Sequence, residues 1–163
     1  MLRHMIALLC LGLIAGCAPR GNVPTGEAAR AGVDATLNAL HQAAADADYD
    51  AYFDLYAPDA VFWGTDATEY WPLEAFKAYT KQRFATGTGW TYVGRERVIH
   101  VRGDVAWFEE QAVNEKYGAL RGSGVLSFQD GRWLIQQYNL STAIPNDIFV
   151  DVLGQIKAYE AAQ

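Results

Sequence analysis

The chain has 163 residues, which is the length of one domain with a short targeting segment. Hydrophobic residues make up 51% of it, enough for a sizeable core, and the formal net charge is −6. Such a chain lacks the excess of Lys and Arg that neutralises phosphates, so its composition argues against nucleic-acid binding.

The first residues have the order of features found in a bacterial lipoprotein leader. Arg3 precedes an apolar run, Met5 to Ile14, which has the length of a signal-peptide core and is short for a membrane span. The following Ala15-Gly16-Cys17 resembles a lipobox, in which small residues before a lipidated Cys allow cleavage. We therefore expect lipidation at Cys17; an ordinary signal peptide with an incidental Cys is the alternative.

This interpretation divides the chain into a signal peptide (1–16), a lipidated tether (17–26) and a domain (27–163). Residue 18 is Ala rather than the Asp that retains such proteins in the inner membrane, so in a Gram-negative organism we expect the periplasmic side of the outer membrane. The other cysteine, Cys10, lies in the leader. The mature domain is thus expected to contain no disulfide, thiol nucleophile or thiolate metal site.

Helical patterns dominate the first half of the domain. Thr25 can cap a helix over about residues 27–46, and a shorter helix is predicted from Asp48 to Pro58. A short strand (60–64) and a polar loop (65–70) follow. Pro72 then suits the first position of a helix that ends near Ala85. The apolar residues of the first helix recur at helical spacing: Val33, Leu37, Leu40 and Ala44.

The second half is predicted to be an antiparallel meander. Four runs rich in Val, Ile, Trp, Tyr and Phe cover residues 90–102, 105–116, 120–129 and 133–141. Asp130-Gly131 between the last two is a strong hairpin signal. A final helix is predicted after Pro145. This order of elements indicates an α+β fold, with helices on one face of a bent sheet.

Several stretches resemble the nuclear transport factor 2-like superfamily, and within it the SnoaL-like group, over about residues 31–147. They are Tyr56–Phe62, Gly64–Asp66, Asp104–Trp107, Gly131–Ile135 and Asn139–Ser141. The resemblance implies a cone-shaped fold, in which a curved antiparallel sheet wraps N-terminal helices and leaves a pocket at its wide end. It also implies a homodimer through the convex sheet face, expected here to carry Trp133, Ile135 and Gln137.

Members of this superfamily include ketosteroid isomerase, dehydratases, polyketide cyclases and non-catalytic binding domains, so the fold does not decide the function. By alignment, the isomerase's oxyanion Tyr and its two acids correspond to Leu40, Gly64 and Gly124. These residues can neither move a proton nor hold an enolate. The isomerase reaction is therefore not expected.

The same alignment, with strand alternation, predicts which residues line the pocket. Gly122 and Gly124 would leave space rather than fill it. An apolar pocket with a few convergent polar groups is typical of a small-molecule site. The predicted lining residues are Tyr56, Phe62, Phe76, Trp107, Glu109, Gln111, Gln136, Tyr138 and Leu140.

Glu109 is the candidate catalytic residue, since a carboxylate in such a pocket could act as a general acid or base. Two alternatives stay open: a register one residue different, with Glu110 inward and Glu109 in solvent, or an inward Glu109 that is simply hydrogen-bonded to Gln111 or Gln136. His100 is a weaker candidate base, and Asp66 and Glu69 could either cap the adjacent loop or contact a ligand at the rim.

His41 and His100 are isolated and have no metal-ligand spacing, so neither a metal nor another cofactor is expected. Three functions stay open: binding of a small, largely apolar molecule without chemistry, an enzyme such as a dehydratase, cyclase or isomerase, and a dimerisation or interaction module. Binding is the preferred hypothesis.

Overall fold

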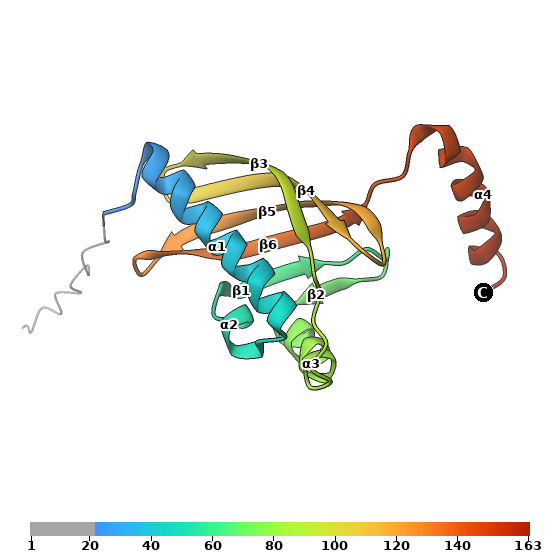
Figure 1. The fold of residues 1–163 in the computed structure, drawn as a ribbon, viewed down its shortest axis with the longest axis horizontal. Helices are drawn as coiled ribbons and strands as arrows, with labels where there is room; N and C mark the ends of the chain where they lie inside the picture. Colours follow the sequence, from blue (N-terminus) through green and yellow to red (C-terminus); the bar gives the residue numbers. More distant parts are fainter. Residues whose placement is uncertain (1–21) are drawn as a thin grey trace, which may run out of the picture.

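The computed structural model describes residues 22–163; the predicted leader and Cys17 lie outside these residues. The fold is α+β, with helices followed by a curved, unclosed sheet of six strands (Figure 1). In chain order the elements are α1 (Gly26–Asp46), α2 (Tyr49–Phe53), β1 (Tyr56–Trp63), β2 (Tyr70–Pro72), α3 (Leu73–Phe84), β3 (Val93–Arg102), β4 (Val105–Asn114), β5 (Gly118–Gln129), β6 (Arg132–Thr142), η1 (Asn146–Ile148) and α4 (Phe149–Glu160).

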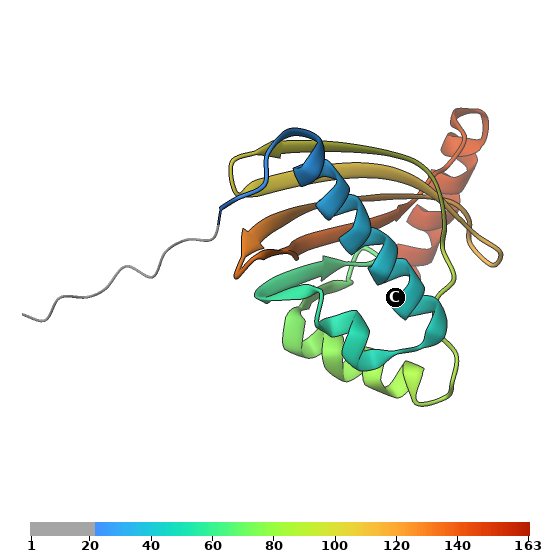
Figure 2. The ribbon, with the colours of Figure 1, turned by 60° about the vertical axis from the view of Figure 1, so that its left-hand side comes forward.

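The strands lie in the order β2-β1-β6-β5-β4-β3, so the predicted meander forms four adjacent strands of one sheet. All neighbouring strands are antiparallel except β1 and β6, which run parallel. The long helix α1 crosses the inner, concave face of the sheet (Figure 2). The predicted apolar stripe of α1 is buried there, because a curved sheet can cover one face of a helix completely.

The register of β4 differs by one residue from the predicted pocket lining. Ala106, Phe108 and Glu110 are buried on the inner face, while Trp107, Glu109 and Gln111 lie on the outer face. Phe108 and Ala106 belong to the hydrophobic core, and the opposite register would expose them to water. The structure thus has the alternative register, in which Glu110 is inward.

A β-bulge in β6 changes which residues face the helix. Val125 pairs with Gln137 and Leu126 pairs with Ile135, so Gln136 has no partner opposite it. The extra residue reverses the alternation of the strand. Trp133 and Ile135 are therefore buried on the inner face before the bulge, and the expectation that they lie on the convex face was wrong. Gln137 is exposed.

Three boundaries also differ from prediction. Tyr56 begins β1 instead of ending the second helix, since its backbone pairs with Ile135 of β6. Residues 70–72, predicted to be a loop and a helix start, form the edge strand β2. The segment predicted to be a final helix is helical, but α4 buries no side chain and extends away from the sheet (Figure 1). Within residues 22–163, no helix is long and apolar enough to cross a membrane.

A candidate ligand-binding cavity beside a buried Glu110 network

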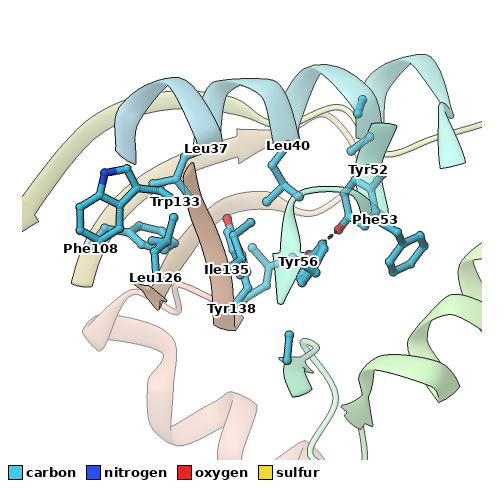
Figure 3. Close-up of a cluster of buried hydrophobic side chains, with 14 of the residues drawn as sticks. Leu37, Leu40, Tyr52, Phe53, Tyr56, Phe108, Leu126, Trp133, Ile135 and Tyr138 are labelled. Carbon is cyan, nitrogen blue, oxygen red and sulfur yellow. Dashed lines mark hydrogen bonds between the residues drawn. The ribbon is translucent and has the colours of Figure 1, made fainter. Parts of the chain in front are cut away.

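A cavity of about 90 Å³ lies between the C-terminal half of α1, β1, β6, α3 and the segment that leads into β3. Its walls are mainly aromatic, and they continue the hydrophobic cluster that fills the space between α1 and the sheet (Figure 3). The lining residues are Leu40, His41, Ala44, Tyr52, Phe62, Gly64, Thr65, Glu69, Trp71, Phe76, Tyr79, Trp90, Tyr92, Tyr117, Tyr138 and Leu140.

Four of the predicted pocket residues line this cavity: Phe62, Phe76, Tyr138 and Leu140. The rings of Phe62 and Phe76 stack with centroids 4.2 Å apart and form one wall of the cavity. Tyr56 lies behind the wall, where its hydroxyl donates a 3.0 Å hydrogen bond to the Tyr52 hydroxyl (Figure 3).

The other predicted residues lie elsewhere. Trp107, Glu109 and Gln111 are on the outer face of β4, and the side chain of Glu109 is 64% exposed. Gln136, at the bulge, donates a hydrogen bond to Ser127 outside the cavity. His100 stacks on Trp107 on this outer face. The residues proposed for proton transfer, Glu109 and His100, are therefore both remote from the cavity.

The buried carboxylate is Glu110, whose side chain is 1% exposed. Its Oε1 accepts a 2.6 Å hydrogen bond from the Tyr138 hydroxyl and lies 3.1 Å from Nε2 of His41. Its Oε2 accepts a hydrogen bond from Nε of Arg97 at 2.8 Å and forms an ion pair with Nη2 of the same guanidinium at 2.7 Å. Both Arg97 contacts therefore go to one carboxylate oxygen, and the hydrogen bond is charge-assisted, which makes it stronger than a neutral one.

Arg97 also connects the network to α1. Its Nη1 donates to Oδ1 of Asp34 at 2.6 Å and to Oδ1 of Asn38 at 2.8 Å. Two carboxylates thus flank the one guanidinium, and they raise its pKa in spite of its partial burial. The network joins α1, β3, β4 and β6, and it fixes the helix to the sheet next to the cavity.

The partners of Glu110 decide its protonation state. Burial raises the pKa of Glu110, but the hydrogen bonds and charges of His41, Tyr138 and Arg97 outweigh it and lower this pKa to about 2. Burial and the adjacent Glu110 charge raise the pKa of Tyr138 well above its ordinary value. At neutral pH the carboxylate is therefore ionised and Tyr138 keeps its proton. The carboxylate can orient His41 and Tyr138, but it holds no proton to give.

At the mouth of the cavity, the loop before β2 places an acid beside a glycine. A Cβ on Gly64 would lie 2.1 Å from Oε2 of Glu69, so a larger residue here would displace this carboxylate. Glu69 Oε2 accepts a hydrogen bond from the backbone N–H of Asp66 at 3.2 Å. Asp66 itself accepts from the N–H and hydroxyl of Thr68, which caps the loop and lowers the pKa of Asp66. Of the two acids, Asp66 is the cap and Glu69 lines the cavity.

His41 was missed as a lining residue, although the sequence carried a signal for it. It follows Leu37 by four residues and precedes Ala44 by three, so it falls on the buried stripe of α1. Residues 22–163 contain no group of three or more His, Cys, Asp or Glu side chains that could hold a metal ion.

The family model of the SnoaL-like domain matches residues 33–145 of this chain. The chain belongs to the SnoaL-like domain family. The match includes every residue that lines the cavity and ends before η1 and α4. No curated protein matches the sequence.

Solved structures with the same fold have diverse descriptions. An NTF2-like protein of unknown function from Pseudomonas putida KT2440 superposes with a TM-score of 0.62 at 19% identity, covering 76% of this chain and 93% of the other. A putative aromatic ring hydroxylase from Novosphingobium aromaticivorans gives 0.61 at 17% identity, with 75% and 94% covered. A putative calcium/calmodulin dependent protein kinase II association domain from Xanthomonas campestris gives 0.54 at 24%, with 78% and 95% covered. At these identities the likeness establishes the fold of the SnoaL-like domain alone.

Proposed function

We propose that this SnoaL-like domain binds a small molecule in its aromatic cavity without converting it, on a lipid-anchored protein of the bacterial cell envelope. The observation that supports binding is an aromatic-walled cavity, next to which the buried acid Glu110 already has its oxygens bonded to protein groups. A cavity with a few oriented polar groups is the usual form of a small-molecule site.

The size of the cavity limits the ligand. Sites for drug-sized molecules commonly measure about 300–1,000 Å³. At about 90 Å³ this cavity suits a compact molecule, and the stacked rings of Phe62 and Phe76 keep it from widening easily. A molecule the size of a steroid would require several wall residues to move.

Native mass spectrometry of the chain begun at Ala18 tests the binding function. We expect a gently purified sample to carry an additional mass that disappears on denaturation. Thr65→Trp should abolish this mass, because exposed Thr65 lines the mouth of the cavity. Ala67→Trp in the same loop is the matched control, since Ala67 is exposed but does not line the cavity. Bare wild-type protein would contradict binding and favour an interaction module.

An enzyme that transfers a proton is the second candidate, and the position of Glu69 favours it. The resemblance to ketosteroid isomerase aligns that enzyme's base with Gly64, and the Glu69 carboxylate occupies the space above Gly64. Incubation of the protein and its co-purified molecule in D₂O distinguishes the two functions. Deuterium in that molecule, lost in Glu69→Gln, would show proton transfer; an unchanged mass supports binding alone.

The lipid anchor is proposed from the leader sequence, and Cys17→Ser tests it. This variant should remain an unprocessed precursor that incorporates no labelled fatty acid, whereas the wild-type chain incorporates label and fractionates with the outer membrane of a Gram-negative host. Normal processing of Cys17→Ser would refute the anchor.

A homodimer through the outer sheet face is also proposed, with residues that differ from those first expected. Val98, Val105 and Trp107 are at least 38% exposed there and lie on the neighbouring strands β3 and β4. Exposed apolar side chains that gather on one face are typical of an interaction surface. Sedimentation at micromolar concentration should show a dimer that Trp107→Lys dissociates.

A further inference from the structure

We propose that the cavity is a site for a compact organic cation, of the quaternary or methylated ammonium class. This inference rests on the proposed binding function and assigns the chemistry of the ligand. Its basis is the coincidence of an aromatic cage with one carboxylate at the mouth of the same cavity.

The aromatic wall is the first observation. Nine of the sixteen lining residues are aromatic: Tyr52, Phe62, Trp71, Phe76, Tyr79, Trp90, Tyr92, Tyr117 and Tyr138. Several of these rings stack on one another, including Trp71 on Tyr79 and Tyr79 on Trp90. The faces of aromatic rings carry partial negative charge, and a set of rings around a cavity is the arrangement that recognises quaternary ammonium groups.

The balance of formal charge around the cavity is the second observation. Glu69 is half-buried in the wall, and among residues 22–163 no Lys, Arg or His nitrogen lies within 4.0 Å of its carboxylate. His41 is the basic residue of this wall, and its Nε2 lies against ionised Glu110. The negative charge of Glu69 is therefore left to be balanced by a molecule in the cavity or by solvent.

Two rings of the wall already lie close to cations whose residues do not line the cavity. The guanidinium carbon of Arg83 lies 6.0 Å from the ring centroid of Trp90, and Nζ of Lys116 lies 5.0 Å from that of Tyr117. Both cations are on exposed residues, and neither of these residues lines the cavity. The interior of the cage remains available to a further positive charge.

The experiment compares two probes of equal shape and different charge. Choline carries a trimethylammonium group, and 3,3-dimethylbutan-1-ol replaces its nitrogen by carbon. Both are titrated into the ¹⁵N-labelled chain begun at Ala18, and the indole N–H signals are followed by NMR. Trp71 and Trp90 report on the cavity, while Trp107 on the outer face is an internal control.

We expect choline to shift the Trp71 and Trp90 signals, leave Trp107 unchanged, and bind at least about tenfold more tightly than the neutral alcohol. Glu69→Gln should remove most of this preference, since the amide keeps the acceptor for the Asp66 N–H but loses the charge. Glu74→Gln is the matched control: it makes the same change at an exposed acid of α3 outside the cavity and should bind choline like the wild type.

The outcomes distinguish a failure of the cation assignment from a failure of the proposed binding function. Equal binding of the two probes at Trp71 and Trp90 would overturn the cation assignment and leave the cavity a site for neutral molecules. No shift with choline would also overturn the assignment, and the co-purified mass would then decide alone whether the cavity binds anything. Tyr79→Leu provides a test independent of Glu69. Loss of one ring of the cage should weaken the binding of choline more than the binding of 3,3-dimethylbutan-1-ol.

Discussion

The hydroxyl of Tyr138 on β6 donates a 2.6 Å hydrogen bond to Oε1 of Glu110 on β4, although β5 lies between these two strands. The bond passes over Gly122 of β5. A Cβ at this position would lie 2.6 Å from the Tyr138 hydroxyl oxygen and 2.8 Å from Oε1 of Glu110. The space that Gly122 leaves is thus used by the buried network and not by a ligand.

Gly122→Ala is expected to destabilise the fold by about 1–3 kcal/mol, because the new methyl group forces Tyr138 and Glu110 apart and leaves buried polar atoms without partners. Gly94→Ala on the edge strand β3 is the control, since its Cβ would meet only the tip of Arg97 at 4.0 Å. Urea unfolding followed by circular dichroism measures both. Equal stability of the two variants would mean that the Tyr138 bond is dispensable.

Glu110→Gln and Glu109→Gln make the same change at neighbouring positions on opposite faces of β4. The first leaves Arg97 with one carboxylate fewer in a buried site, and we expect a loss of about 3–5 kcal/mol. The second alters a 64% exposed side chain and should change the free energy of unfolding by no more than about 0.5 kcal/mol. The reverse ranking would show that the register of β4 is the one first predicted.

Acid should destabilise the protein through Glu110. Its pKa is about 2 in the folded chain and 4.5 ordinarily, so between these values the unfolded chain binds a proton that the folded chain does not. This contribution is complete above pH 4.5 and is lost as the pH falls toward 2, on the order of 3 kcal/mol in total. Unfolding curves from pH 2 to 5 should show a shallower pH dependence in Glu110→Gln than in Glu109→Gln.

Removal of residues 146–163 should leave the stability of the domain within about 0.5 kcal/mol of the full chain. No side chain of α4 is buried, and the family match ends at residue 145. Comparison of denaturation midpoints for the two lengths provides the measurement. A clear loss of stability on truncation would show that α4 packs on the domain in solution.

Local patterns predicted most of the fold. The stripe of α1 and the Asp130-Gly131 hairpin were both recognisable because each depends on residues close together in the chain. Tyr56 was assigned to the wrong element because this end of its strand pairs only with β6, far along the sequence. The sequence of β6 gives no sign of the bulge at Gln136. The prediction therefore continued one inward–outward alternation through the whole strand and placed the residues before the bulge on the wrong face.

The cavity was less predictable than the fold. Phe62 and Tyr138 were found because they lie on strands, beyond the irregular positions of β1 and β6, whereas Trp90 comes from a loop whose path depends on tertiary contacts. Glu69, also in a loop, was named only as a possible rim contact. Arg97 was not considered at all. Arg97 belongs to a network built from four elements that are far apart in the sequence, so no spacing along the chain predicts its contacts.

The position of the cavity along α1 has a consequence for how a ligand arrives. Gly26 begins the helix at the end nearest the N-terminal tether, and the first cavity residue, Leu40, lies 14 residues further on. At 1.5 Å per residue this places the cavity about 20 Å along the helix from its first residue. The cavity thus lies toward the opposite end of α1 from the segment that carries the proposed anchor, so a ligand would reach it from the fluid around that end of the helix.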